Sequence, residues 1–194
     1  MKNTGRCREL LVEGATVYVQ HHDNPSRKTS YSLITVQKGE LLVNMDSQAP
    51  NAAVEEWLPK SGLFQEITKI KREATYGSSR FDFYVEADGK RCFMEVKGVT
   101  LEEDGVVRFP DAPTQRGAKH LEELCKCMED GFAAYVIFVV QMRPVNYFTP
   151  HTERDPVFSA ALKKAYDSGV SVLAVDCAVT PDTMEIREFV PVVL

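Results

Sequence analysis

The strongest constraint on the fold is an uninterrupted apolar segment in the second half of the chain, residues 132–141. It is rich in aromatic and β-branched residues, and it ends at the polar residue Gln141. A run of this kind without polar alternation is typical of a β-strand that is buried on both faces of a sheet. Such a strand needs covering layers, so the segment predicts an α/β architecture.

The neighbouring segments agree with this prediction. From residue 51 the order is helix, three strands, helix, strand, helix, strand, with a possible edge strand at the end. We expect helices over 52–58, 114–129 and 156–167, strands over 67–76, 81–87, 91–99, 132–141, 170–179 and 183–189, and a Gly- and Pro-marked loop over 100–113. This order predicts a three-layer α/β domain with a mixed sheet over residues 49–194.

The first part of the chain has a different character. Residues 1–48 alternate like β-strands over 16–20, 30–37 and 40–45, and a polar loop over 21–28 separates the first two. We therefore expect a small, separate β domain before the α/β domain.

Composition excludes several classes of protein. The chain has 194 residues, 44% of them hydrophobic, and a net charge of −5, so it is globular and has no overall basic field for nucleic acid. Its apolar runs are too short to span a membrane, and its first residues lack the apolar core of a signal peptide. Five cysteines without paired spacing are typical of reduced thiols, which predicts a cytoplasmic protein.

The chemistry is concentrated in a predicted hairpin, in which residues 80–86 and 91–97 are joined by a turn at 87–90. Glu95 and Lys97 lie two residues apart, so they share one face of a strand. Asp82 lies between Phe81 and Phe83, so it is expected to project away from an apolar face. Two carboxylates and an ammonium group can hold a divalent cation and orient a water for phosphodiester hydrolysis. The alternative is a solvated hairpin face with alternating charges.

Several short runs resemble the sugar fermentation stimulation protein A family. They are Asn3-Thr4-Gly5-Arg6, Asn24-Pro25, Arg27-Lys28-Thr29, Pro50-Asn51, Ser79-Arg80-Phe81-Asp82-Phe83, Glu95-Val96-Lys97, Phe109-Pro110-Asp111-Ala112-Pro113-Thr114, Arg116-Gly117, Lys119-His120 and Phe138-Val139-Val140-Gln141. The resemblance covers essentially the whole chain. It implies an OB-like barrel followed by a PD-(D/E)xK nuclease-like domain, DNA binding, and a regulatory role in sugar metabolism, notably that of maltose.

Members of this family usually carry a few dozen further residues before the Asn-Thr-Gly run, which begins here at Asn3. The resemblance therefore implies an OB-like domain over residues 1–48 that is incomplete in this sequence. A missing strand leaves an open sheet edge, and such an edge can pair with a second copy of the chain, so a homodimer is one expectation.

The resemblance also implies a metal site. Asp82 and Glu95 are expected to bind Mg²⁺ or Mn²⁺, with Lys97 positioning or deprotonating the attacking water or neutralising charge on phosphorus. In this nuclease class the preceding helix often supplies another acid, and Glu56 occupies the matching position. Glu55 competes with it, and a simple surface glutamate is the alternative.

Further residues are candidates for binding phosphate or DNA. Arg116, Lys119 and His120 share one face at the start of a helix after Thr114, where the helix dipole favours an anion, although Thr114 could equally be an N-cap before an exposed basic face. In the β domain, basic and aromatic residues suit single-stranded DNA: Arg6, Arg27, Lys28, Tyr18 and Tyr31. Gln141, at the end of the buried strand, is either a site residue or a structural one.

Together these features predict a DNA-binding protein with a metal-dependent nuclease-like site, and one interpretation of that site is a deoxyribonuclease. The same site could also hydrolyse RNA or another phosphodiester. The alternative is a non-catalytic DNA-binding regulator that keeps the nuclease fold.

Overall fold

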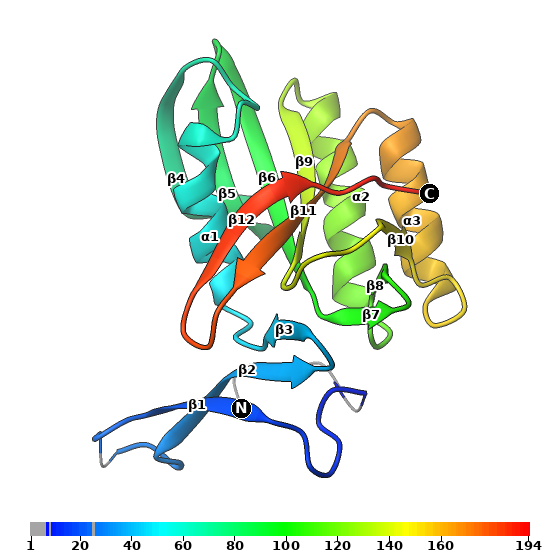
Figure 1. Cartoon of the computed structure of the whole chain (residues 1–194). Helices are drawn as coiled ribbons and strands as arrows, with labels where there is room; N and C mark the ends of the chain where they lie inside the picture. Colours follow the sequence, from blue (N-terminus) through cyan, green and yellow to red (C-terminus); the bar gives the residue numbers. More distant parts are fainter. Residues whose placement is uncertain (1–6, 8, 25) are drawn as a thin grey trace.

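The computed structural model describes residues 7, 9–24 and 26–194. The first part of the chain forms a three-stranded antiparallel sheet in the order β1-β2-β3 (Figure 1). Its strands are β1 (Val17–His21), β2 (Tyr31–Lys38) and β3 (Leu41–Asn44). The prediction of a small β domain is therefore confirmed.

The rest of the chain is built on a six-stranded mixed sheet in the order β12-β11-β9-β6-β5-β4. Its strands are β4 (Ile67–Tyr76), β5 (Ser79–Ala87), β6 (Lys90–Val99), β9 (Ala133–Val140), β11 (Ser171–Val179) and β12 (Met184–Phe189). The three central strands β6, β9 and β11 are parallel, and the outer pairings are antiparallel. The mixed sheet that the sequence predicted is confirmed.

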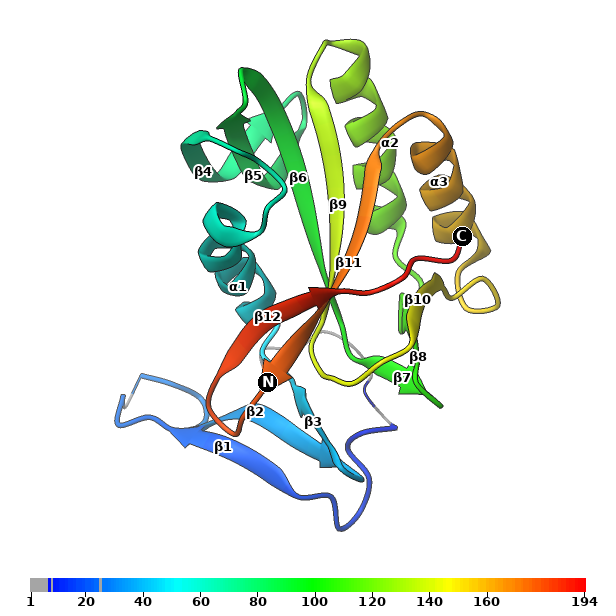
Figure 2. The same cartoon turned by 45° about the horizontal axis from the view of Figure 1, so that its top comes forward.

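Helices cover both faces of this sheet (Figures 1 and 2). On one face lie α1 (Ala49–Trp57) and a short 3₁₀ turn, η1 (Leu58–Lys60), and on the other lie α2 (Gln115–Glu129) and α3 (Pro156–Asp167). Ile137 packs in the cluster under α1 and Phe138 in the cluster under α2 and α3, and both are fully buried. Because β9 is covered on both faces, every position along it can be apolar.

Two details differ from the prediction. Helix α1 starts at Ala49, three residues earlier than expected, because Pro50 lies in the first turn, where a missing N–H costs nothing. The predicted loop over 100–113 contains β7 (Leu101–Glu103) and β8 (Val106–Phe109), which form a small sheet with β10 (Tyr147–Pro150). The turn between β7 and β8 is Asp104-Gly105, and both residues have positive φ, at 52° and 80°. This Asp-Gly signal for a hairpin was present in the sequence.

The two parts of the chain are joined by polar contacts. The amide nitrogen of Asn44 donates to the carbonyl oxygen of Gln141 at 2.9 Å, and Lys38 pairs with the buried Glu102. Val36, Val43 and Met45 of the small β domain belong to the same buried cluster as Phe138. No helix of the described part of the chain is long and apolar enough to cross a membrane.

Candidate functional site

Asp82 lies where strands β5 and β6 separate. Their ladder runs from Ala87 to Phe83, which pairs with Met94, and beyond it the N–H of Val96 donates to Asp82 Oδ2 at 2.8 Å. Phe81 packs in the cluster under α2, whereas Phe83 packs in the cluster under α1. The regular alternation of side chains along β5 is therefore broken at Asp82. We expected Phe81 and Phe83 to share one apolar face from which Asp82 points away, and this expectation is wrong.

Glu95 is the most buried acid of the site, with 4% of its surface exposed. Its Oε1 accepts a hydrogen bond from Lys97 Nζ at 2.7 Å and contacts His120 Nδ1. Its Oε2 is buried and finds no hydrogen-bond partner among the described residues. Burial raises the pKa of Glu95, but the hydrogen bond with His120 and the charge of Lys97 outweigh it, so the pKa lies below its ordinary value. The result is a buried, ionised carboxylate with one oxygen still unpaired, which is costly unless a ligand takes it.

The pKa of Asp82 is set by burial and by the nearby Glu95. Burial raises the pKa of Asp82, and so does the negative charge of Glu95, while hydrogen bonds from Val96 and Asn51 oppose them; the pKa lies above its ordinary value. Two mutually repelling carboxylates fit a divalent cation, which binds oxygen ligands and relieves their repulsion. Among the described residues, no three His, Cys, Asp or Glu side chains are gathered as a metal-binding set, so water and phosphate would complete the coordination.

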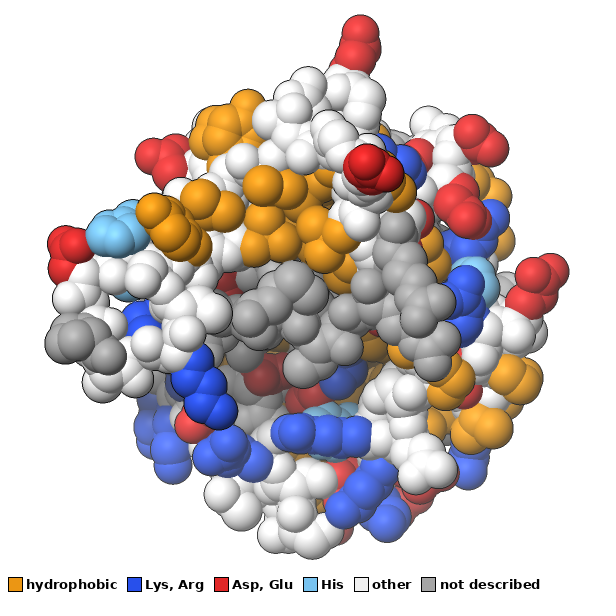
Figure 3. Space-filling model, turned by 90° about the horizontal axis from the view of Figure 1, so that it is seen from below, with side chains coloured by type: hydrophobic (Ala, Val, Ile, Leu, Met, Phe, Trp, Pro, Cys, Tyr) orange, Lys and Arg blue, Asp and Glu red, His pale blue; other side chains and the backbone are white. Residues whose placement is uncertain are grey.

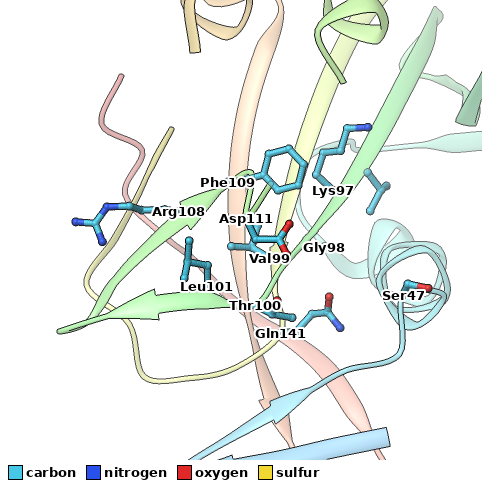
Figure 4. Close-up of a pocket in the computed structure, with 11 residues that line it drawn as sticks. Ser47, Lys97, Gly98, Val99, Thr100, Leu101, Arg108, Phe109, Asp111 and Gln141 are labelled. Atoms are coloured by element: carbon cyan, nitrogen blue, oxygen red, sulfur yellow. The ribbon is translucent and has the colours of Figure 1, made fainter. Parts of the chain in front are cut away.

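A cavity of about 200 Å³ opens beside Lys97 (Figure 4). It is lined by residues 96–101, which run from the end of β6 into β7, by the segment around Phe109 and Asp111, and by Gln141. Asp111 is the acidic residue among those that line it (Figure 4). Lys97 thus pairs with Glu95 through its ammonium group and is also one of the residues that line an open cavity.

Glu56, the acid expected from the preceding helix, does not join this site. It is exposed and lines a separate hollow with Trp57, Lys60 and Met184. Its competitor, Glu55, pairs with Arg72 at 3.3 Å. The helix residue that reaches the site is Asn51, whose Nδ2 donates to Asp82 Oδ1 at 2.8 Å. Sequence reasoning missed Asn51 because it looked for an acid and placed the start of the helix too late.

Helix α2 reaches the same site from the other face of the sheet. Arg116 Nε donates to His120 Nε2 at 3.3 Å. Because a guanidinium group only donates, Nε2 accepts, and the ring proton is on Nδ1, toward Glu95. Arg116, His120 and Glu95 thus form a chain from the surface to the buried carboxylate. Thr114 caps the helix by accepting from Gly117 N at 3.0 Å, and Lys119 lies 3.7 Å from Glu123.

The remaining candidates lie in or next to the small β domain. Arg27 Nη2 donates to Ser32 Oγ at 2.7 Å, Lys28 is exposed, and Arg6 lies outside the described residues. Gln141 Nε2 donates to Asn44 O at 2.9 Å, which is a contact between domains. Figure 3 shows Lys and Arg side chains gathered around a His side chain on one part of the face seen from below, while hydrophobic side chains occupy another part.

Comparison with known proteins gives the family. Residues 48–183 match the model for the sugar fermentation stimulation protein RE domain, and residues 1–45 match that for the SfsA N-terminal OB domain. The sugar fermentation stimulation protein homolog of Clostridium beijerinckii is 55% identical over 194 residues, which are 100% of this chain and 86% of that protein. The homolog of Ruminiclostridium cellulolyticum is 54% identical over 192 residues, which cover 99% and 85%.

A solved structure agrees. The structure of Pyrococcus furiosus SfsA in complex with Ca²⁺ superposes with a TM-score of 0.90 at 28% identity, covering 100% of this chain and 84% of that one. The fold is therefore an N-terminal OB domain followed by an α/β domain with mixed sheets. This chain belongs to the sugar fermentation stimulation protein family.

Proposed function

We propose that this protein binds DNA and hydrolyses phosphodiester bonds with a divalent cation, Mg²⁺ or Mn²⁺, at Asp82 and Glu95. The observation that carries the proposal is the buried, unpaired Oε2 of Glu95 beside a second carboxylate and a lysine. The Ca²⁺ in the Pyrococcus furiosus structure supports a divalent cation in this family.

Asp82 and Glu95 would hold the cation through carboxylate oxygens, which hard divalent ions prefer. The bound ion would supply a Lewis acid and lower the pKa of a bound water. Within the described part of the chain the site offers two carboxylates, and Mg²⁺ sites that also use substrate phosphate commonly have one or two.

The protein side chains supply the rest of the chemistry. His120, with its Nδ1 proton toward Glu95, fixes the orientation of that carboxylate. Lys97 lies at the rim of the cavity and can place its positive charge on a phosphate oxygen as negative charge develops there. Arg116 and Lys119 at the start of α2 can contact the backbone phosphates on either side, in addition to the dipole of the helix.

The OB domain would guide the strand toward the site. Lys28 and the exposed Tyr31 offer charge and a stacking surface, which is how OB domains hold single-stranded DNA. Arg27, and Arg6 outside the described residues, would add phosphate contacts. We therefore propose DNA, including single-stranded DNA, as the partner.

A second candidate function is a DNA-binding regulator of sugar metabolism genes that holds phosphate through the cation without cleaving it. The observation in its favour is that α1 brings the amide of Asn51 to the site where this nuclease class often has an acid.

The test is a cleavage assay with labelled single-stranded DNA, double-stranded DNA and RNA, in Mg²⁺, Mn²⁺ or EDTA. Glu95→Gln keeps the shape and removes the charge, and we expect it to lower cleavage about 100-fold or more. Glu122→Gln, an exposed acid on α2, is the matched control and should leave the rate unchanged. Cation-dependent DNA binding without cleavage of any substrate would support the regulator and refute the nuclease.

A further inference from the structure

Asn51 holds Asp82 from the side opposite to strand β6. Its Nδ2 donates to Asp82 Oδ1 at 2.8 Å, while the N–H of Val96 donates to Oδ2 at 2.8 Å. Each carboxylate oxygen has about two acceptor positions, so one position on each oxygen remains for a further ligand. The orientation of Asp82 is thus fixed from two sides without using up its capacity to bind a cation.

The two acids of α1 make their contacts elsewhere. Glu55, one turn later in α1, pairs with Arg72, and Glu56 faces a different hollow. Within residues 7, 9–24 and 26–194, Asp82 and Glu95 are not joined by a third His, Cys, Asp or Glu side chain in a metal-binding set. The two acids carry two negative charges, which balance one divalent cation, and a second cation would need more anionic ligands.

We propose that Asn51 is a positioning residue that orients Asp82 and limits the site to one divalent cation per chain. This inference rests on the proposed metal site and adds a residue and a stoichiometry to it. An aspartate at this position would bring a third negative charge beside Asp82 and Glu95. Like charges at short range in a partly buried site repel strongly, so that aspartate would weaken the metal-free fold. The amide of Asn51 donates a hydrogen bond instead, which stabilises the metal-free protein and keeps the cation affinity moderate.

The test uses the full chain and three variants, without nucleic acid. Asn51→Asp adds a ligand charge, so we expect a lower melting temperature in EDTA, about tenfold tighter Mn²⁺ binding, and a larger rise in melting temperature on adding Mn²⁺. Asn51→Ala removes the support of Asp82 and should weaken Mn²⁺ binding about tenfold. Glu55→Gln, on the same helix but paired with Arg72, is the control and should bind Mn²⁺ like the wild type. Titration calorimetry should give one Mn²⁺ per wild-type chain.

Several results would overturn the inference: two Mn²⁺ ions per wild-type chain, no Mn²⁺ binding, or an Asn51→Asp variant that binds Mn²⁺ no more tightly than the wild type. If Asn51→Asp does not fold even with Mn²⁺, Asn51→Ala decides, and an unchanged affinity there refutes the role of Asn51.

The outcome is separable from that of the proposed function. Metal-dependent cleavage by the wild type together with unchanged binding in the Asn51 variants would reject the inference alone. One bound cation with the expected shifts, but no cleavage of any nucleic acid, would reject the nuclease alone.

Discussion

Gln141 links the α/β domain to the small β domain through its side-chain amide. It follows strand β9 and has 2% of its surface exposed. Its Nε2 group donates to Asn44 O at 2.9 Å, with longer contacts to Asn44 Oδ1 at 3.2 Å and to Asp46 O at 3.3 Å. Gln141→Met keeps the length of the side chain and removes both donors, so the change isolates these hydrogen bonds.

The cost of this change follows from the geometry. Losing the hydrogen bond at 2.9 Å leaves the carbonyl oxygen of Asn44 without this buried donor. A buried polar group that loses its partner costs about 1–3 kcal/mol. The two longer contacts add little, so we expect the free energy of unfolding to fall by about 2 kcal/mol. For a chain of this size that corresponds to a melting temperature about 4–8 °C lower.

Urea unfolding followed by the fluorescence of Trp57 would measure the loss, and hydrogen exchange should show faster opening of the amides in β2 and β3. Gln37→Met is the matched control, since Gln37 Nε2 donates to Gly39 O at 3.1 Å in an exposed turn, and it should change stability by less than about 0.5 kcal/mol. Mn²⁺ affinity should stay unchanged in both variants. A Gln141→Met protein with wild-type stability but impaired Mn²⁺ or DNA binding would refute the structural role and make Gln141 a site residue.

Three further predictions concern stability and binding. Burial raises the pKa of Glu102, but hydrogen bonds from Lys38 and from the amide of Gly105 outweigh it, and the pKa lies below its ordinary value. The stabilisation from this lowered pKa is therefore fully present above the ordinary pKa of a glutamate and is lost as the pH falls through the lowered pKa. The stability gap between wild type and Glu102→Gln, measured by urea unfolding from pH 7 to pH 3, should therefore shrink on acidification. Asp155 is the N-cap of α3, where it accepts a hydrogen bond from Phe158 N at 2.9 Å, and it also accepts one from Thr114 N at 2.8 Å. Asp155→Ala should therefore lower the free energy of unfolding, measured in urea, by about 2 kcal/mol. A loss below about 0.5 kcal/mol would contradict this double role. If Lys119 contacts a phosphate, Lys119→Gln should weaken DNA binding by a similar factor for every DNA sequence. In fluorescence anisotropy, the slope of log affinity against log salt concentration should become smaller by about one. An unchanged slope would remove Lys119 from the interface.

Much of the architecture was predictable because it depends on local patterns. The apolar run over 132–141 predicted a strand covered on both faces, and Ile137 and Phe138 pack in the clusters on opposite sides of the sheet. The two-residue spacing of Glu95 and Lys97 placed both side chains on one side of β6, where they form a hydrogen bond. These features follow from the periodicity of a strand, which the sequence displays directly.

Other features depend on contacts that periodicity does not encode. The direction of Asp82 changes because the β5–β6 ladder ends at Phe83, and the end of a ladder is decided by how two strands pack into the whole sheet. Asn51 and Glu56 lie five residues apart on α1, about 140° apart around the helix axis, so a helix that turns Asn51 toward Asp82 turns Glu56 away from it. Which of the two faces the sheet is decided by how α1 packs against the sheet, and the spacing of residues within the helix does not show this.

The two carboxylates of the site are held by different layers of the domain. Asp82 is tied to α1 through Asn51, and Glu95 is tied to α2 through His120, so each acid is anchored to the helix on its own face of the sheet. A cation bound to both acids would therefore connect the two helical layers through the strands between them. Because such binding stabilises only the folded state, divalent cations should raise the melting temperature of the α/β domain as a whole. It follows that the geometry of the site is set by the packing of both helices, and core substitutions under either helix should weaken cation binding as well as stability.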